Sequence, residues 1–294
     1  MEVDSVPVLV ISGFLGAGKT SLVRVVLEDA QRRGLRVALV SNELGELGID
    51  QALLGAGASE MVELKGGCVC CALSDDLIET LQMLRERARP DRIVIETSGV
   101  ALPFETQLNF WREPISTWIG DDMTAVVVNA EQLDLGRDLE GTFQDQVTSA
   151  DLLVLNKIDL VDGTRLAGLE ARLRALEPEA PIVRCERGRV DPTLLFPPEL
   201  SGRDRRGPAP QAVAHSHEQF VTEELRVERG IAPQRLEQML REAGPLRAKG
   251  FVETSEGLRV VQVVGRRIEF EDVEGETDSD LIGRIVLIRR ADTR

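Results

Sequence analysis

The chain has 294 residues, of which 43% are hydrophobic and 29% charged, a balance that supports a folded core and excludes a disordered chain. Acidic residues outnumber basic ones by 50 to 35, and the net charge of −15 disfavours nucleic acid and anionic membranes as partners. The first residues lack a basic, apolar leader pattern, and no uncharged apolar run approaches the roughly 18 residues of a membrane span. We therefore expect a cytoplasmic protein of about two domains.

Short apolar runs alternate with amphipathic stretches over the first two thirds of the chain. Runs rich in Val, Ile and Leu predict buried strands at residues 6–12, 35–41, 92–95, 124–128 and 152–155. Apolar residues at helical spacing predict helices at residues 20–33, 73–88 and 165–176. This alternation predicts a doubly wound α/β fold, in which a mainly parallel sheet carries helices on both faces.

The composition changes near residue 197, where Pro, Gly and charged residues become frequent as far as residue 217. Such a stretch is typical of a linker. Beyond it we expect a helix at 233–243 and strands at 220–227, 250–253, 258–264, 268–272 and 284–288. The predicted organisation is a first domain over 1–199, a linker over 200–216, and a smaller α+β domain with a mainly antiparallel sheet over 217–294.

A glycine-rich stretch follows the first predicted strand and opens the first predicted helix. Its pattern is that of a phosphate-binding loop, in which glycines let backbone N–H groups curl around phosphate oxygens. In such a loop Lys19 bridges the β- and γ-phosphates and Thr20 holds Mg²⁺. The alternative is a plain glycine-rich turn. The loop predicts a P-loop NTPase whose nucleotide contacts come from Gly13, Gly16, Ala17, Gly18, Lys19, Thr20 and Ser21.

An acidic residue ends the strand predicted at 92–95. Glu96 follows this buried run, and Gly99 comes shortly after it. In P-loop proteins an acid in this place faces the Mg²⁺ ion, and the glycine responds to the γ-phosphate. We therefore group Glu96 with Lys19 and Thr20 as candidate catalytic residues. A surface acid at a strand end is the alternative.

The tetrapeptide Asn156-Lys157-Ile158-Asp159 follows the strand predicted at 152–155. The Asp159 carboxylate can accept hydrogen bonds from guanine N1–H and N2–H₂, a pair that adenine does not offer. The aliphatic part of Lys157 could pack on the base. The motif predicts GTP and GDP as ligands, and an ATP-dependent enzyme with redox-active cysteines is the alternative.

Three of the four cysteines stand together at Cys68, Cys70 and Cys71. Cysteines this close make a poor disulfide framework, whereas three thiolates suit a soft metal ion such as Zn²⁺ or Co²⁺. Three thiolates leave a fourth position open, which the carboxylate of Glu43, water or a partner protein could fill. Glu43 is our candidate, and it belongs to a glycine-rich acidic segment at 42–50 that suits a switch. Buried structural cysteines, thiol redox chemistry and a solvated acidic loop are the alternatives.

These motifs together resemble the CobW-like family of phosphate-loop GTPases, which are related to the urease and hydrogenase metal-insertion GTPases. A looser likeness covers KGF (249–251) and RIVLI (284–288). The resemblance rests mainly on GFLGAGKT (13–20), NELGELGID (42–50), GGCVCC (66–71), ETSGVALP (96–103), QVTSADLLVLNKIDL (146–160) and PIVRCERGRVDPTLL (181–195).

The resemblance implies a GTP-dependent metallochaperone with slow intrinsic hydrolysis. Its metal, Zn²⁺ or Co²⁺, would bind Cys68, Cys70 and Cys71, with Glu43 as a further ligand, and would pass to a client metalloprotein. A homodimer is compatible with this picture, and a GTP- and metal-binding sensor or scaffold with little hydrolysis is the alternative. We expect GTP and Mg²⁺ to draw the cysteine loop toward the nucleotide and raise its metal affinity.

The chain also departs from the family pattern. Asn129 stands where the family usually has Asp after the central strand, and the histidine-rich stretch of many members is reduced to His215 and His217. These two histidines could bind a metal transiently or have no role. Cys185 stands apart from the cysteine cluster and is expected to pack in the core.

Overall fold

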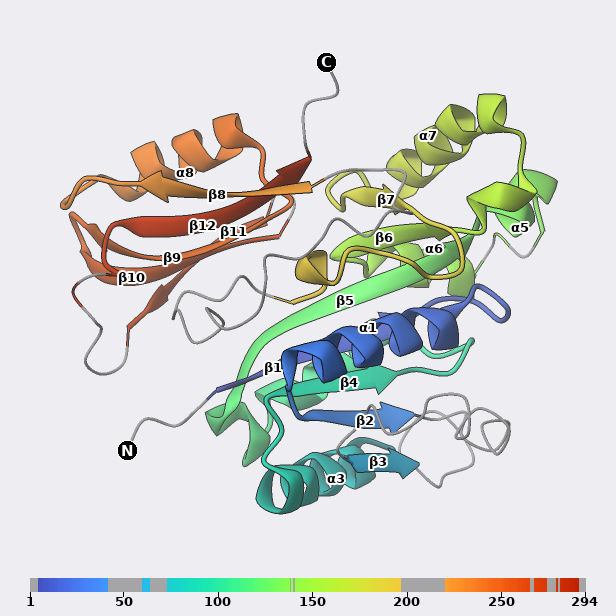
Figure 1. Ribbon diagram of the computed structural model, residues 1–294, viewed down its shortest axis with the longest axis horizontal. Coiled ribbons are helices and arrows are strands. Elements are labelled where there is room, and N and C mark those ends of the chain that lie inside the picture. Colours follow the sequence, from blue (N-terminus) through green and yellow to red (C-terminus); the bar gives the residue numbers. More distant parts are fainter. Residues whose placement is uncertain are drawn as a thin grey trace.

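The computed structural model describes residues 5–41, 60–63, 73–137, 141–196, 220–264, 267–273 and 281–290, together with Leu139 and Ser279. Figure 1 shows two sheets, the second of them at the upper left, with the long strand β5 running through the larger one. In the part of the chain described here, no helix is long and apolar enough to cross a membrane.

The larger sheet confirms the predicted parallel arrangement. In the described residues its strands run in the order β3-β2-β4-β1-β5-β6-β7, and every neighbouring pair is parallel. The strand that carries the glycine-rich loop, β1, lies in the middle. The bounds are β1 (Val6–Ser12), β2 (Val37–Ser41), β3 (Glu60–Glu63), β4 (Arg92–Glu96), β5 (Ile119–Asn129), β6 (Leu152–Asn156) and β7 (Ile182–Arg184).

Helices cover both faces of this sheet, as predicted. Leu9 and Ile11 point toward α1 (Lys19–Arg33) and share its core cluster. Val8 and Val10 alternate with them and pack with α3 (Leu73–Ala88). The face shared with α3 continues over β5 and β6, where it packs with α5 (Ala130–Leu135), α6 (Thr142–Thr148) and α7 (Leu166–Leu176).

Several elements differ from the sequence prediction. The central strand begins at Ile119 rather than at residue 124, because Ile119 pairs with Val6 and Asp122 with Val8 across a shift in register. The short strands β3 and β7 were not predicted, nor were α5 and α6. The same holds for α4 (Pro103–Gln107) and the 3₁₀ turns η2 (Leu108–Trp111), η3 (Ile115–Thr117), η4 (Ile158–Leu160), η5 (Gly163–Arg165) and η6 (Pro192–Leu194).

The second sheet is antiparallel, as predicted, in the order β11-β10-β9-β12-β8 over the described residues. Leu236 and Leu240 of α8 (Pro233–Ala243) pack against Val252 and Val261 on one of its faces. The predicted strand at 250–253 is longer than expected at both ends. The bounds are β8 (Phe220–Arg226), β9 (Arg247–Thr254), β10 (Gly257–Val264), β11 (Arg267–Asp272) and β12 (Arg284–Arg290).

The two sheets meet along the first half of β5. Leu246 and Ile288 belong to the same core cluster as Met123 of the larger sheet. The Lys249 ammonium lies 2.5 Å from the Asp121 carboxylate and forms an ion pair across the junction. The predicted linker at 200–216 lies outside the described residues, so the domain boundaries stay predictions.

Candidate nucleotide site

The glycine-rich loop lies at the carboxyl end of β1, where an α/β sheet ordinarily binds its ligand. Gly13 and Gly18 have φ angles of 136° and 105°, a region that side chains rarely adopt. A Cβ atom on Gly13 would lie 2.2 Å from the Val127 carbonyl oxygen, and one on Gly18 would lie 2.3 Å from the Asn156 amide nitrogen. The glycines are therefore required by the backbone path of the loop.

The predicted catalytic residues meet at this loop. Lys19 is 5% exposed, and its ammonium donates a hydrogen bond of 3.1 Å to the Gly13 carbonyl oxygen, across the loop. Thr20 Oγ1 donates to Glu96 Oε1 at 2.9 Å, and Glu96 is 2% exposed at the end of β4. A hydroxyl and a buried carboxylate side by side are hard oxygen donors, which fit Mg²⁺ beside a phosphate cradle.

Asn156 links the base-recognition motif to the phosphate loop. Its side-chain N–H donates to the Ala17 carbonyl oxygen at 2.9 Å, and its Oδ1 accepts from the Gly188 backbone N–H at 3.0 Å. The Cys185 thiol also donates to this oxygen, at 3.4 Å. Asn156 is 1% exposed, and its side-chain amide joins β6 to the glycine-rich loop and to the segment around Gly188.

Asp159 lies exposed in η4, directly beyond Asn156, and Lys157 adopts a left-handed conformation with φ 62°. Their contacts with a guanine base stay a prediction. Asn129, which departs from the family pattern, caps the N-terminus of α5 by accepting from the backbone N–H groups of Glu131 and Gln132.

Gly99 lies against the phosphate loop, and its response to the γ-phosphate stays a prediction. A Cβ atom on Gly99 would lie 2.6 Å from the Leu15 side chain and 2.9 Å from the Leu15 backbone nitrogen. The fully buried Gln146 of α6 donates to the carbonyl oxygens of Gly99 at 3.1 Å and Ala101 at 2.9 Å. The segment that follows Glu96 is thus held between the loop and α6.

Sequence reasoning did not assign functions to Gln146 and Gly188. Both lie inside stretches that resemble the family, but the residues around them do not predict which groups they contact. A Cβ atom on Gly188, whose φ is 69°, would lie 2.6 Å from the Leu22 backbone nitrogen. Its glycine character and position shortly after an apolar run were the available signals. Cys185 is 1% exposed, so its predicted core packing is confirmed.

The candidate metal ligands Cys68, Cys70, Cys71 and Glu43 lie outside the described residues, as do His215 and His217. Among the residues that the structure does describe, no group of three or more His, Cys, Asp or Glu side chains could hold a metal ion. The metal site therefore stays a prediction from the sequence.

Comparison with known proteins decides the family. Residues 7–184 match the family described as "CobW/HypB/UreG, nucleotide-binding domain". The chain belongs to this family. Residues 220–293 match a second one, "Cobalamin synthesis protein cobW C-terminal domain", so the antiparallel sheet also has CobW counterparts.

Two curated relatives and one solved structure illustrate the likeness. The chain is 32% identical to "Zinc chaperone CobW" of Sinorhizobium sp, over 90% of this chain and 86% of that protein. It is 36% identical to "Zinc-regulated GTPase metalloprotein activator 1" of Schizosaccharomyces pombe, over 64% of this chain and only 47% of that protein. The crystal structure of Zn(II)-bound YjiA GTPase from E. coli has the same fold, with a TM-score of 0.50 at 21% identity, covering 97% and 93% of the two chains.

Proposed function

We propose that this CobW-family protein is a GTP-hydrolysing metallochaperone, which binds Zn²⁺, with Co²⁺ as the other candidate, and delivers it to a client metalloprotein. The observation that carries the proposal is the match over 90% of the chain to a relative named as a zinc chaperone. The three clustered thiols at Cys68, Cys70 and Cys71 supply the donor type that such a cargo needs. The proposal places the protein in a reducing cytoplasm, where these thiols stay free.

The nucleotide is proposed to bind with its phosphates against the loop from Gly13 to Ser21. Lys19 would neutralise phosphate charge, and Thr20 and Glu96 would hold Mg²⁺, which stabilises the charge that develops on the transferred phosphoryl group. Gly99 would respond to the γ-phosphate through its position against Leu15. Asp159 and Lys157 would select guanine, while Asn156 keeps the loop in place for both.

Nucleotide and metal are proposed to act on one another through the segments between the loop and Glu96. Cys68, Cys70, Cys71 and Glu43 all fall between α1 and β4 in the chain, so they connect the elements that hold Thr20 and Glu96. If GTP tightens metal binding, the metal tightens GTP binding by the same factor, because linkage is reciprocal. Intrinsic turnover would be slow and would rise when metal or client binds.

A second function is a sensor or scaffold that binds GTP and metal but hydrolyses little GTP. Turnover experiments separate the two. Phosphate release from GTP is measured under single-turnover conditions, with and without Zn²⁺ and Co²⁺. The metallochaperone predicts slow release that the metal or the client accelerates, whereas the absence of release under all conditions favours the sensor.

The proposed preference for guanine is tested at Asp159. Asp159→Ala should remove the preference for GTP over ATP in a competition assay with a fluorescent nucleotide, because the carboxylate is the proposed base contact. Asp162→Ala is the matched control, since Asp162 is exposed nearby and accepts instead from Thr164. A variant of Asp159 that keeps the GTP preference contradicts the assignment.

A further inference from the structure

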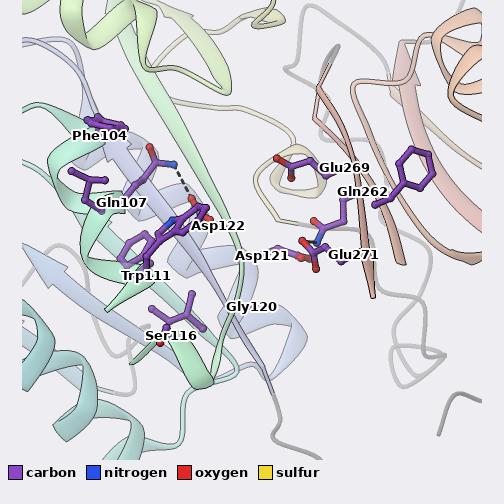
Figure 2. Close-up of a pocket in the computed structure, with 14 residues that line it drawn as sticks. Phe104, Gln107, Trp111, Ser116, Gly120, Asp121, Asp122, Gln262, Glu269 and Glu271 are labelled. Atoms are coloured by element: carbon purple, nitrogen blue, oxygen red, sulfur yellow. Dashed lines mark hydrogen bonds between the residues drawn. The ribbon is translucent and has the colours of Figure 1, made fainter. Parts of the chain in front are cut away.

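A groove of about 780 Å³ separates the two sheets on the side of α4 and η2. Figure 2 shows that Phe104, Gln107 and Trp111 line it from the larger domain, and that Gln262, Glu269 and Glu271 face them from the antiparallel sheet. The described residues that line this groove are separate from the nucleotide loop, and the function proposed above assigns the groove no role.

One wall of the groove is apolar and exposed. The side chains of Phe104, Leu108 and Trp111 are 58%, 51% and 84% exposed. The same segment is anchored by Phe110 and Trp118, which are almost fully buried in the core beneath α3. Large apolar side chains held out to solvent on an anchored segment are typical of interaction sites, where aromatic residues contribute much of the binding energy.

The other wall is polar because of strand register. Val252 and Val261 face α8 and form the core of the second sheet. Glu269 lies opposite Gln262, which in turn lies opposite Lys249. Since side chains alternate across a sheet, these three and Glu271 share the face that α8 does not cover. That face carries charge toward the groove.

The groove has an excess of negative charge. The described residues that line it include four carboxylates, Asp121, Asp122, Glu269 and Glu271, and no basic side chain. Lys249, next to them, is committed to Asp121 at 2.5 Å. The pKa of Glu271 is raised from its ordinary value, first by burial and then by the charge of Asp121, while Lys249 opposes the shift in part. A cationic ligand would relieve this crowding.

We propose that the groove docks a segment of a partner protein that carries arginine or lysine beside an aliphatic side chain. The aliphatic side chain would pack on Trp111 and Phe104, and the cations would be attracted by the carboxylates that line the opposite side of the groove. A second copy of this chain is disfavoured because the chain carries a net charge of −15. The inference rests on the proposed function only in naming the partner, which would be the client.

Docking in this groove is expected to change the nucleotide site. The exposed wall begins at Pro103, directly beyond the segment that Gln146 fixes at Gly99 and Ala101. A partner that displaces α4 would therefore also displace Gly99, the residue proposed to respond to the γ-phosphate. Binding itself needs neither nucleotide nor metal, so it can be measured separately from the proposed function.

The test uses the full chain without added nucleotide or zinc and a short fluorescein-labelled peptide that alternates leucine with arginine. Two comparison peptides alternate leucine with glutamate and serine with arginine. Affinity is read by fluorescence anisotropy at low and high salt. The variants are Trp111→Ala and the double change Glu269→Gln with Glu271→Gln. The matched controls are Leu135→Ala, which is 54% exposed on α5, and Glu242→Gln, on α8 at the opposite face.

We expect the leucine–arginine peptide to bind best, and Trp111→Ala to weaken it at least about tenfold. The double glutamine variant should weaken binding about threefold or more and flatten its salt dependence. The controls should bind as the unmodified chain does, and thermal unfolding should show all variants folded. Equal binding of the glutamate peptide, no binding of either arginine peptide, or equal losses in the controls would overturn the proposal. Self-association lost in Trp111→Ala would assign the groove to a second copy instead.

Discussion

The nucleotide edge of the parallel sheet and the groove face of the antiparallel sheet are built on different principles. At the nucleotide edge, buried groups from distant parts of the chain hold one another, as Asn156 does with Ala17 and Gly188. At the groove, the positions of surface side chains such as Glu269 and Glu271 follow mainly from strand register, and Glu271 also accepts a hydrogen bond from Gln262 on the neighbouring strand. Changes at the first region should therefore disturb fold and binding together, whereas changes at the second should leave the fold intact.

The largest effect is expected at Gly13. Gly13→Ala would place a methyl group 2.2 Å from the Val127 carbonyl oxygen at a φ of 136°, which costs about 2–4 kcal/mol of unfolding free energy. Nucleotide affinity should fall by at least about a hundredfold. Gly16→Ala is the control, because its φ of 72° is also positive but no atom lies within 4 Å of its added methyl group, and its cost should be about 1 kcal/mol. If the two variants lost similar amounts of unfolding free energy, steric conflict with Val127 would not explain the loss in Gly13→Ala.

Asn156→Ala should have the next largest effect. It leaves the Ala17 carbonyl and the Gly188 N–H buried without their partner, at a cost of about 2–4 kcal/mol of unfolding free energy. Denaturant unfolding measures the cost, and nucleotide affinity should fall in the same variant. Cys185→Ala, which removes the thiol hydrogen bond and a small packed volume but keeps Asn156, should cost about 1 kcal/mol. If both variants cost the same, Asn156 does not join the three segments.

Asp91 tests the acid stability of the larger domain. Burial opposes its ionisation, but hydrogen bonds from the side chain and backbone of Arg36 outweigh burial and hold the pKa of Asp91 below its ordinary value of 3.8. The stabilisation is therefore present above pH 3.8 and is lost as the pH falls through the lowered pKa. Asp91→Asn should cost about 0.5 kcal/mol near neutral pH, since the pair is partly exposed, and the difference from the unmodified chain should vanish in strong acid. A constant difference at all pH values would contradict this.

Substitution of Glu271 should change the unfolding free energy in the opposite direction to substitution of Asp91, and by the smallest amount. Its pKa is raised by burial and by Asp121, so its ionisation opposes folding once the pH exceeds the ordinary value of 4.5. Glu271→Gln should raise the unfolding free energy by a few tenths of a kcal/mol at neutral pH after allowance for solvent screening. The gain should disappear below pH 4.5, where the carboxyl is protonated in both states. Destabilisation by this variant at neutral pH would mean that the groove is not crowded with negative charge.

The sequence predicted the two sheets well because their central strands are buried and strongly apolar. Residues 6–12 and the helices at 73–88 and 233–243 were located to the residue. The strands β3 and β7 were missed since they are short and lie at the edges of the sheet. The first half of β5 contains Gly120, Asp121 and Asp122, which disfavour strands, and only its pairing with β1 makes it one.

The candidate site was predicted where a local motif states the chemistry, as at Lys19, Thr20 and Glu96. It was not predicted where a contact depends on the tertiary fold. Gln146 donates to Gly99 and Ala101 from a helix far along the chain, and the residues around Gln146 do not predict these contacts. The groove could not be foreseen either, because it exists only where the two sheets meet.

The most direct test of the metallochaperone proposal is the affinity of the full chain for Zn²⁺ in its two nucleotide states. A chromophoric chelator competes for the metal in the presence of either GDP or a non-hydrolysable GTP analogue with Mg²⁺. Absorbance of bound Co²⁺ reports whether thiolates are ligands, and Cys70→Ser is the control. Tighter metal binding with the GTP analogue, by at least about fivefold, is the predicted result. Equal affinity in the two states would contradict GTP control of the metal.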